Sequence, residues 1–129
     1  MKIIFPLVVT LLMSSLDAAR DPIRLTHGPM LGHPTSSSVR VWARTSDPGE
    51  FQVLYGTEEA KLELISKSAD TKIESDNTGY ATLENLSPDQ RYHYQIQVNG
   101  RPHGLPGSFL TLPSAEQTRN KEHNPEGLF

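Results

Sequence analysis

Residues 91–100 read RYHYQIQVNG, and they predict the fold more strongly than any other part of the chain. Large apolar residues occupy every second position, with polar residues between them: Tyr92, Tyr94, Ile96 and Val98. Because side chains alternate between the two faces of a β-strand, this spacing predicts a strand with one buried face. Asn99-Gly100 follows at once, and both residues accept the positive φ of a hairpin turn. We expect the chain to return over Phe109–Leu112, with residues 101–107 forming a longer connection.

A second alternating segment, Phe51–Tyr55, follows the turn residues 46–49 and ends at Gly56. Further strand candidates lie between Gly, Pro, Asn, Asp and Ser residues, at 23–26, 38–44, 62–67 and 80–86. No window shows sustained apolar spacing of the helical kind. Seven short strands in about 90 residues are typical of a β-sandwich. The sequence therefore predicts an all-β domain over residues 20–113.

Two segments allow more than one interpretation. Residues 58–67 favour a helix by propensity, and one helical turn before a strand would fit both patterns. In residues 38–45, one strand face carries Val39, Val41 and Ala43, and the other carries Arg40, Trp42 and Arg44. Trp42 then lies either buried between the arginine side chains or over the edge of the core.

Composition excludes several classes of function. The chain has 129 residues, which is the size of one domain, and a formal net charge of −3 without any basic cluster. We therefore expect no nucleic-acid partner, because nonspecific binding to phosphates needs a positive surface. The absence of cysteine excludes disulfides, thiolate nucleophiles, iron–sulfur clusters and cysteine-ligated zinc.

The first 19 residues have the three parts of a secretory signal peptide: Lys2, an apolar run from Ile3 to Met13, and small residues up to Ala19. The run is too short to span a membrane. We expect cleavage near Ala18 or Ala19 and a secreted, periplasmic or cell-envelope protein; an uncleaved N-terminal element is the alternative. Residues 114–129 have the composition of a polar linker until Leu128 and Phe129.

No residue pattern points to chemistry in this chain. The histidines, at His27, His33, His93 and His103 among others, lack zinc-motif spacing, and His27 and His33 fall in a Gly/Pro-rich loop. No nucleophile elbow accompanies the serines, and the acidic residues between 58 and 76 are expected to be solvated. Three of the four tyrosines lie on inward strand patterns, so we expect no exposed aromatic platform for stacking. Asn85-Leu86-Ser87 matches the glycosylation acceptor pattern, which occurs often by chance.

Three motifs resemble known families. Residues 86–94, LSPDQRYHY, resemble the segment that opens the sixth strand of fibronectin type III modules, in which the first tyrosine forms a tyrosine corner; Tyr92 would take that role. Residues 107–113, GSFLTLP, resemble the closing strand of fibronectin-like modules in secreted phosphatases. Residues 27–32, HGPMLG, with 38–45, SVRVWART, and 53–56, VLYG, resemble the N-terminal domain of PhoD-like alkaline phosphatases and phosphodiesterases, the alkaline phosphatase D family.

This resemblance implies a fibronectin type III or Ig-like sandwich of about seven strands. In the family the module precedes a calcium- and iron-dependent metallophosphoesterase domain, a hydrolase. That domain would be the partner in cis, and its hallmark G-N-H-D/E run does not occur here. No catalytic, cofactor-binding or metal-binding residue is therefore carried over, and we expect no cofactor in this chain. The residues with an expected structural role are Trp42, Tyr92, Tyr94 and Phe109.

We thus expect a monomeric, non-catalytic accessory domain of a secreted phosphatase, truncated before its catalytic domain and inactive alone. The alternative is a free-standing exported binding or adhesion module with the same fold. Its candidate contacts would be loops at one end of the sandwich, His27–Thr35 and Asn99–Gly107. The sequence beyond Phe129 would discriminate the two hypotheses.

Overall fold

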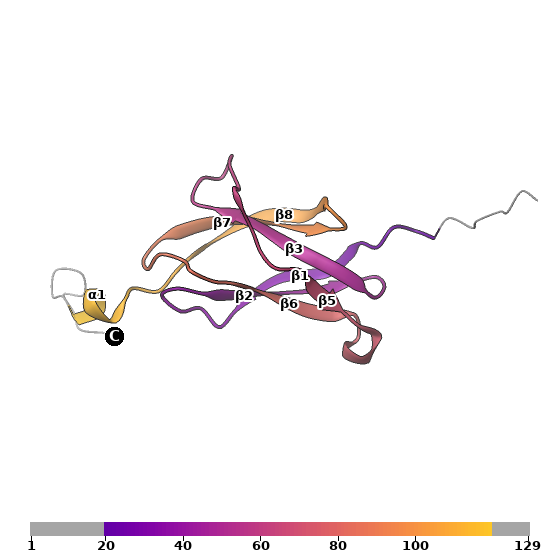
Figure 1. Cartoon of the computed structure of the whole chain (residues 1–129), viewed down its shortest axis with the longest axis horizontal. Coiled ribbons are helices and arrows are strands. Elements are labelled where there is room, and N and C mark those ends of the chain that lie inside the picture. The colour runs from indigo at the N-terminus through magenta and orange to yellow at the C-terminus, as the bar shows by residue number, and fades with distance from the viewer. Residues whose placement is uncertain (1–19, 120–129) are drawn as a thin grey trace, which may run out of the picture.

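The computed structural model describes residues 20–119 and forms two packed antiparallel sheets (Figure 1). The first sheet has the order β1-β2-β6 and consists of β1 (Leu25–Gly32), β2 (Val39–Thr45) and β6 (Thr78–Leu83). The second has the order β4-β3-β7-β8, with β5 also paired to β3: β3 (Gly49–Gly56), β4 (Leu64–Ile65), β5 (Ala69–Thr71), β7 (Arg91–Val98) and β8 (Arg101–Leu110). The predicted all-β, fibronectin type III-like sandwich is confirmed, with eight strands between residues 20 and 119.

Two short helices complete the described chain, the 3-10 turn η1 (Ile73–Ser75) and the helix α1 (Ala115–Arg119). Neither of these helices has the length or apolar character that crossing a membrane requires. The predicted signal peptide, residues 1–19, and the last part of the predicted linker, residues 120–129, lie outside the described residues.

The core lies between the inner faces of the two sheets. Period-two alternation places Tyr92, Tyr94, Ile96 and Val98 of β7 in it, as the sequence predicts. The inward residues of the neighbouring strands complete the core, and they include Val39, Val41, Ala43, Phe51, Val53, Tyr55, Leu83 and Phe109. One core contact joins β7 to β8, where the rings of Tyr92 and Phe109 stack at 5.6 Å.

The expected long connection after Asn99-Gly100 is wrong. Val98 pairs directly with Arg101, so the hairpin has two residues, with φ of 50° at Asn99 and 73° at Gly100. Two positive φ values give the turn a twist that matches the flanking strands. Strand β8 then runs through Pro102 and Pro106 and lies at the edge of its sheet, where a missing N–H is tolerated.

Gln95 explains how β8 accommodates its irregular middle. The register between β7 and β8 shifts between Tyr94 and Ile96, which leaves carbonyl groups of β8 without a ladder partner. The Gln95 side chain donates hydrogen bonds to the carbonyls of His103 at 2.7 Å and Gly104 at 3.1 Å. Gln95 is buried, although the alternation had placed it on the exposed face.

The Gly/Pro-rich segment from His27 onward is also a strand rather than a loop. Strand β1 extends to Gly32, with two register shifts against β2. Gly28 allows this path because its φ is +100° and a Cβ there would lie 2.9 Å from the carbonyl oxygen of Trp42. As an edge strand, β1 has one side without a sheet partner, which permits Pro29.

The segment between β3 and β5 contains no helix. An isolated bridge joins Glu58 to Lys61, and only Leu64–Ile65 of the predicted strand 62–67 is extended in register with β3. Ser66 takes over the next pairing position, because its hydroxyl accepts a hydrogen bond from the Val53 N–H and its own N–H donates to the Val53 carbonyl. Tertiary pairing thus overrides the helical propensity.

The first part of the predicted polar linker is helical. Helix α1 begins after Ser114, whose hydroxyl accepts a hydrogen bond from the Gln117 N–H at 3.2 Å, while the Gln117 side chain accepts one from the Ser114 N–H at 2.7 Å. This is a capping box, and its S-x-x-Q spacing was visible in the sequence.

Candidate binding surfaces

The three aromatic residues with expected structural roles on β7 and β8 meet in the core. Tyr92 stacks on Phe109, and the rings of Tyr94 and Phe109 lie 6.0 Å apart. The Tyr92 hydroxyl accepts a hydrogen bond from the Ser87 N–H at 2.8 Å, which is the geometry of a tyrosine corner. Burial raises the pKa of the Tyr94 phenol, because the charged form would lose its hydration.

Trp42 lies on the other side of its sheet from the core. Its neighbours in the chain, Val41 and Ala43, are fully buried, whereas Trp42 faces outward and is half-buried. Its cross-strand partners are Met30 of β1 and Tyr80 of β6. Directly opposite residues share a sheet face, so these three side chains form one row across the sheet, which we call the outer row. Met30 is 62% exposed and Tyr80 57% exposed.

The outer row corrects the expectation that no aromatic platform is exposed. The sequence predicts that Tyr80 lies in a strand. It does not predict that Tyr80 pairs with Trp42, because the register between two distant strands cannot be derived from the sequence of either strand alone. The guanidinium carbon of Arg40 lies 4.9 Å above the centre of the Tyr80 ring, a cation–π contact. Arg40 is exposed, and none of the ion pairs between described residues involves it.

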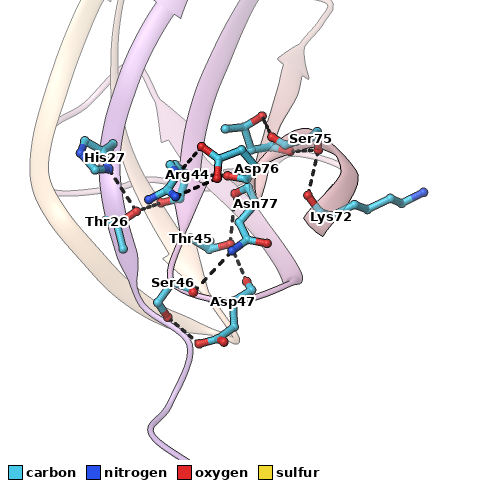
Figure 2. A network of polar contacts seen from close by, with 11 residues as sticks. Thr26, His27, Arg44, Thr45, Ser46, Asp47, Lys72, Ser75, Asp76 and Asn77 are labelled. Carbon is cyan, nitrogen blue, oxygen red and sulfur yellow. Dashed lines mark hydrogen bonds and ion pairs between the residues drawn. The ribbon is translucent and has the colours of Figure 1, made fainter.

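A polar network borders the outer row where β2 ends (Figure 2). Arg44 donates from Nη2 to Oδ1 of Asp76 at 2.9 Å, and from Nε to the Asp76 carbonyl and Oδ2. The hydrogen bond and charge of Arg44 hold the pKa of Asp76 below its usual value, and Asp76 raises the pKa of Arg44. Asp76, expected to be merely solvated, thus ties η1 to β2, although its side chain remains exposed and that of Arg44 is half-buried.

The same network continues toward the core. The hydroxyls of Thr45 and Thr71 meet at 2.6 Å in the interior, and the Thr45 N–H donates to the Asn77 carbonyl. The side-chain oxygen of Asn77 is buried without a hydrogen-bond partner among the described residues, while its amide donates weakly toward the Ser46 carbonyl at 3.5 Å. On β1, the Thr26 hydroxyl lies between His27 and the Arg44 carbonyl. These contacts hold the turn after β2 against the end of η1.

A second surface lies where the chain leaves the sandwich. A hollow of about 390 Å³ is lined mainly by apolar atoms of Asp89, Leu110, Thr111, Leu112, Pro113 and Thr118. We call it the exit hollow. Leu110 is 51% exposed and Leu112 48% exposed. The hollow is held in place by the Thr111 hydroxyl, which donates to the Ser87 carbonyl, and by the Leu112 N–H, which donates to the Thr35 carbonyl.

The remaining candidate residues are the histidines, the acidic side chains and Asn85. Between residues 20 and 119 no three His, Asp or Glu side chains are grouped so that they could hold a metal ion. His27 and His33 are exposed, and His93 and His103 are half-buried on the second sheet. Asn85 is exposed, with a φ of 57°.

Comparison with protein families identifies one match: residues 22–109 fit the model of a domain of unknown function, DUF7800. The chain belongs to the DUF7800 family. Comparison of this DUF7800 chain with curated protein sequences finds no match. The family description assigns no activity, so function has to be inferred from the surfaces described above.

Solved structures share the fold of this DUF7800 domain. PhoD matches 72% of this chain at a TM-score of 0.56 and 17% identity, and the match covers 19% of the PhoD chain. The sensor domain of the anti-sigma factor RsgI4 in Pseudobacteroides cellulosolvens matches 71% of this chain at a TM-score of 0.52 and 17% identity, covering 94% of that domain. At these identities the likeness concerns the fold alone. The chain spans about a fifth of the length of PhoD.

Proposed function

We propose that this domain is a non-catalytic accessory domain of a secreted PhoD-like metallophosphoesterase, and that it packs against the catalytic domain through the exit hollow. The observation that carries the proposal is the fold likeness to one part of PhoD, which supports the resemblance of residues 27–32 and 38–45 to the N-terminal domain of that family. Calcium and iron belong to the catalytic domain in this account. The described residues do not fit such a metal site, so no step of phosphate ester hydrolysis is assigned to them.

The exit hollow suits an intramolecular contact. Leu110, Leu112 and Pro113 present apolar surface directly before helix α1, so a domain joined after α1 would be tethered beside them. A tether raises the local concentration of the partner to the millimolar range, and a small apolar contact then suffices. Interfaces between domains of one chain are of this modest, partly polar kind.

Titration of the full chain against a PhoD-like metallophosphoesterase domain that lacks its own N-terminal module tests this proposal. We expect binding by calorimetry with a dissociation constant in the micromolar to millimolar range, and a loss of about tenfold or more for Leu110→Ser. Ile65→Ser is the matched control, because Ile65 is 52% exposed but lies on the opposite edge of the same sheet, on β4. Absence of binding, or equal losses in the two variants, would contradict the proposal.

One observation favours the alternative of a free-standing binding module. The RsgI4 sensor domain is matched over nearly its whole length, so a sandwich of this kind also serves as the sensor domain of an anti-sigma factor. The contact segments expected for this alternative are not loops: most of His27–Thr35 lies in β1, and most of Asn99–Gly107 lies in β8. The structure does bring them together, since a Cβ on Gly104 would lie 3.2 Å from the Leu25 side chain and 3.9 Å from Pro29. A reading frame after Phe129 that encodes no phosphatase would favour this alternative.

A further inference from the structure

The outer row lies on a sheet face that no other described element covers. In Figure 1 the sheet β1-β2-β6 forms the lower layer, with the second sheet packed only against its upper face. Met30, Trp42 and Tyr80 therefore present a continuous apolar and aromatic surface to solvent. Single exposed apolar residues are ordinary on a protein surface, whereas a contiguous exposed row across three strands is a candidate interaction site.

The residue types in this surface are those of a protein interface. Trp, Tyr, Met and Arg are enriched where proteins bind one another, and Trp, Tyr and Arg dominate the binding energy. The two aromatic side chains have few rotatable bonds and are braced by cross-strand neighbours, so little entropy is lost when a partner covers them. Met30 is flexible and adapts its shape to a partner.

The charges of this surface indicate the chemistry of the partner. Among the described residues no carboxylate forms an ion pair with Arg40, whereas the charge of Arg44 is compensated by Asp76. The guanidinium carbon of Arg40 lies 4.9 Å from the centre of the Tyr80 ring, and no ion pair between described residues occupies its N–H groups. Those N–H groups match a carboxylate in two parallel hydrogen bonds.

The same contact covers one face of the Tyr80 ring, which leaves less aromatic surface on which a sugar ring could stack. A carboxylate with apolar neighbours satisfies both the guanidinium edge and the apolar row. We propose that the outer face of the sheet β1-β2-β6 binds an acidic protein segment, with a carboxylate on Arg40 and apolar side chains over Trp42 and Tyr80.

The single tryptophan of the chain provides a direct readout, because a partner that covers Trp42 shifts its fluorescence emission. The probe is a synthetic peptide of about ten residues with alternating glutamate and leucine, and the matched peptide has lysine in place of glutamate. Cellohexaose, a neutral oligosaccharide, tests the sugar alternative. We expect a saturable blue shift with the glutamate peptide alone, weakened at high salt.

Two charge reversals localise the contact. Arg40→Glu is expected to weaken binding of the glutamate peptide about tenfold or more. Arg91→Glu has little effect, because Arg91 is an exposed residue on the second sheet. Unchanged thermal midpoints show that both variants fold. Binding of both peptides alike, equal losses in the two variants, a response to cellohexaose instead, or no emission shift up to about 2 mM peptide would overturn the proposal. The exit hollow lies outside this sheet, so the peptide experiment can fail or succeed independently of docking through that hollow.

Discussion

The hydroxyl of Tyr92 accepts a 2.8 Å hydrogen bond from the backbone N–H of Ser87, and the Ser87 carbonyl in turn accepts one from the Thr111 hydroxyl. These two hydrogen bonds tie the connection between β6 and β7 to the end of β8. Tyr92→Phe keeps the ring stacked on Phe109 but leaves the Ser87 N–H without its partner. We expect a loss of about 1–2 kcal/mol in the free energy of unfolding, measured by urea denaturation.

The control for this substitution is Tyr80→Phe. Tyr80 is also on a strand, but it is exposed on the outer face, so we expect a change within about 0.5 kcal/mol. Equal changes in the free energy of unfolding for the two substitutions would show that the Tyr92 hydroxyl does not stabilise the connection between β6 and β7.

Gly107 is needed for close packing between β8 and β7. A Cβ at this position would lie 2.6 Å from the hydroxyl oxygen of Tyr94, whose ring is buried. Gly107→Ala should therefore cost about 1–3 kcal/mol, because the Tyr94 ring has to shift within a packed core. In Gly32→Ala the new methyl group meets no atom within 4 Å, so thermal unfolding should be nearly unchanged. A stable Gly107→Ala protein with an unshifted Tyr94 environment would refute this packing role.

The ion pair of Arg44 with Asp76 makes stability depend on acid pH. Because the pKa of Asp76 is lowered in the folded state, its stabilising effect is present above the ordinary carboxyl value of 3.8 and is lost as pH falls through the lower folded pKa. Asp76→Asn should be less stable than the wild type near neutral pH, and the difference should shrink below about pH 4 and in high salt. A difference that stays constant with pH would mean that the charge contributes nothing.

Tyr94 makes stability depend on alkaline pH: its stabilising effect is lost as pH rises, whereas that of Asp76 is lost as pH falls. Burial raises its folded pKa above the ordinary value of 10.0, so the stabilisation is complete below that pH and is lost as pH rises through the folded pKa. Tyr94→Phe should be close to the wild type at about pH 7 but lose less stability between about pH 10 and 12. Identical alkaline denaturation of the two proteins would contradict this role of burial.

The sequence predicted the central strands well because their inner and outer faces differ. Alternation located β2, β3 and β7 and most of their buried residues, since each has one side in the core. The edge strands β1 and β8 were missed in part, because their glycines and prolines resemble loop residues, although an edge tolerates missing donors and register shifts.

The candidate surfaces depend on contacts that the sequence does not contain. Trp42 and Tyr80 are 38 positions apart and become neighbours only through the register of β2 against β6. The L-x-P-x-x-x-Y pattern, in contrast, predicts the local contact between Tyr92 and Ser87, because the two residues are only five positions apart in the chain.

In the function proposed above, this domain assists a phosphatase but does not itself hydrolyse phosphate esters. The most direct measurement is hydrolysis of p-nitrophenyl phosphate and bis-p-nitrophenyl phosphate by the purified chain, with calcium and iron supplied. We expect no turnover above the rate of buffer alone. Saturable turnover that disappears when a chelator is added, and returns with metal, would contradict the account.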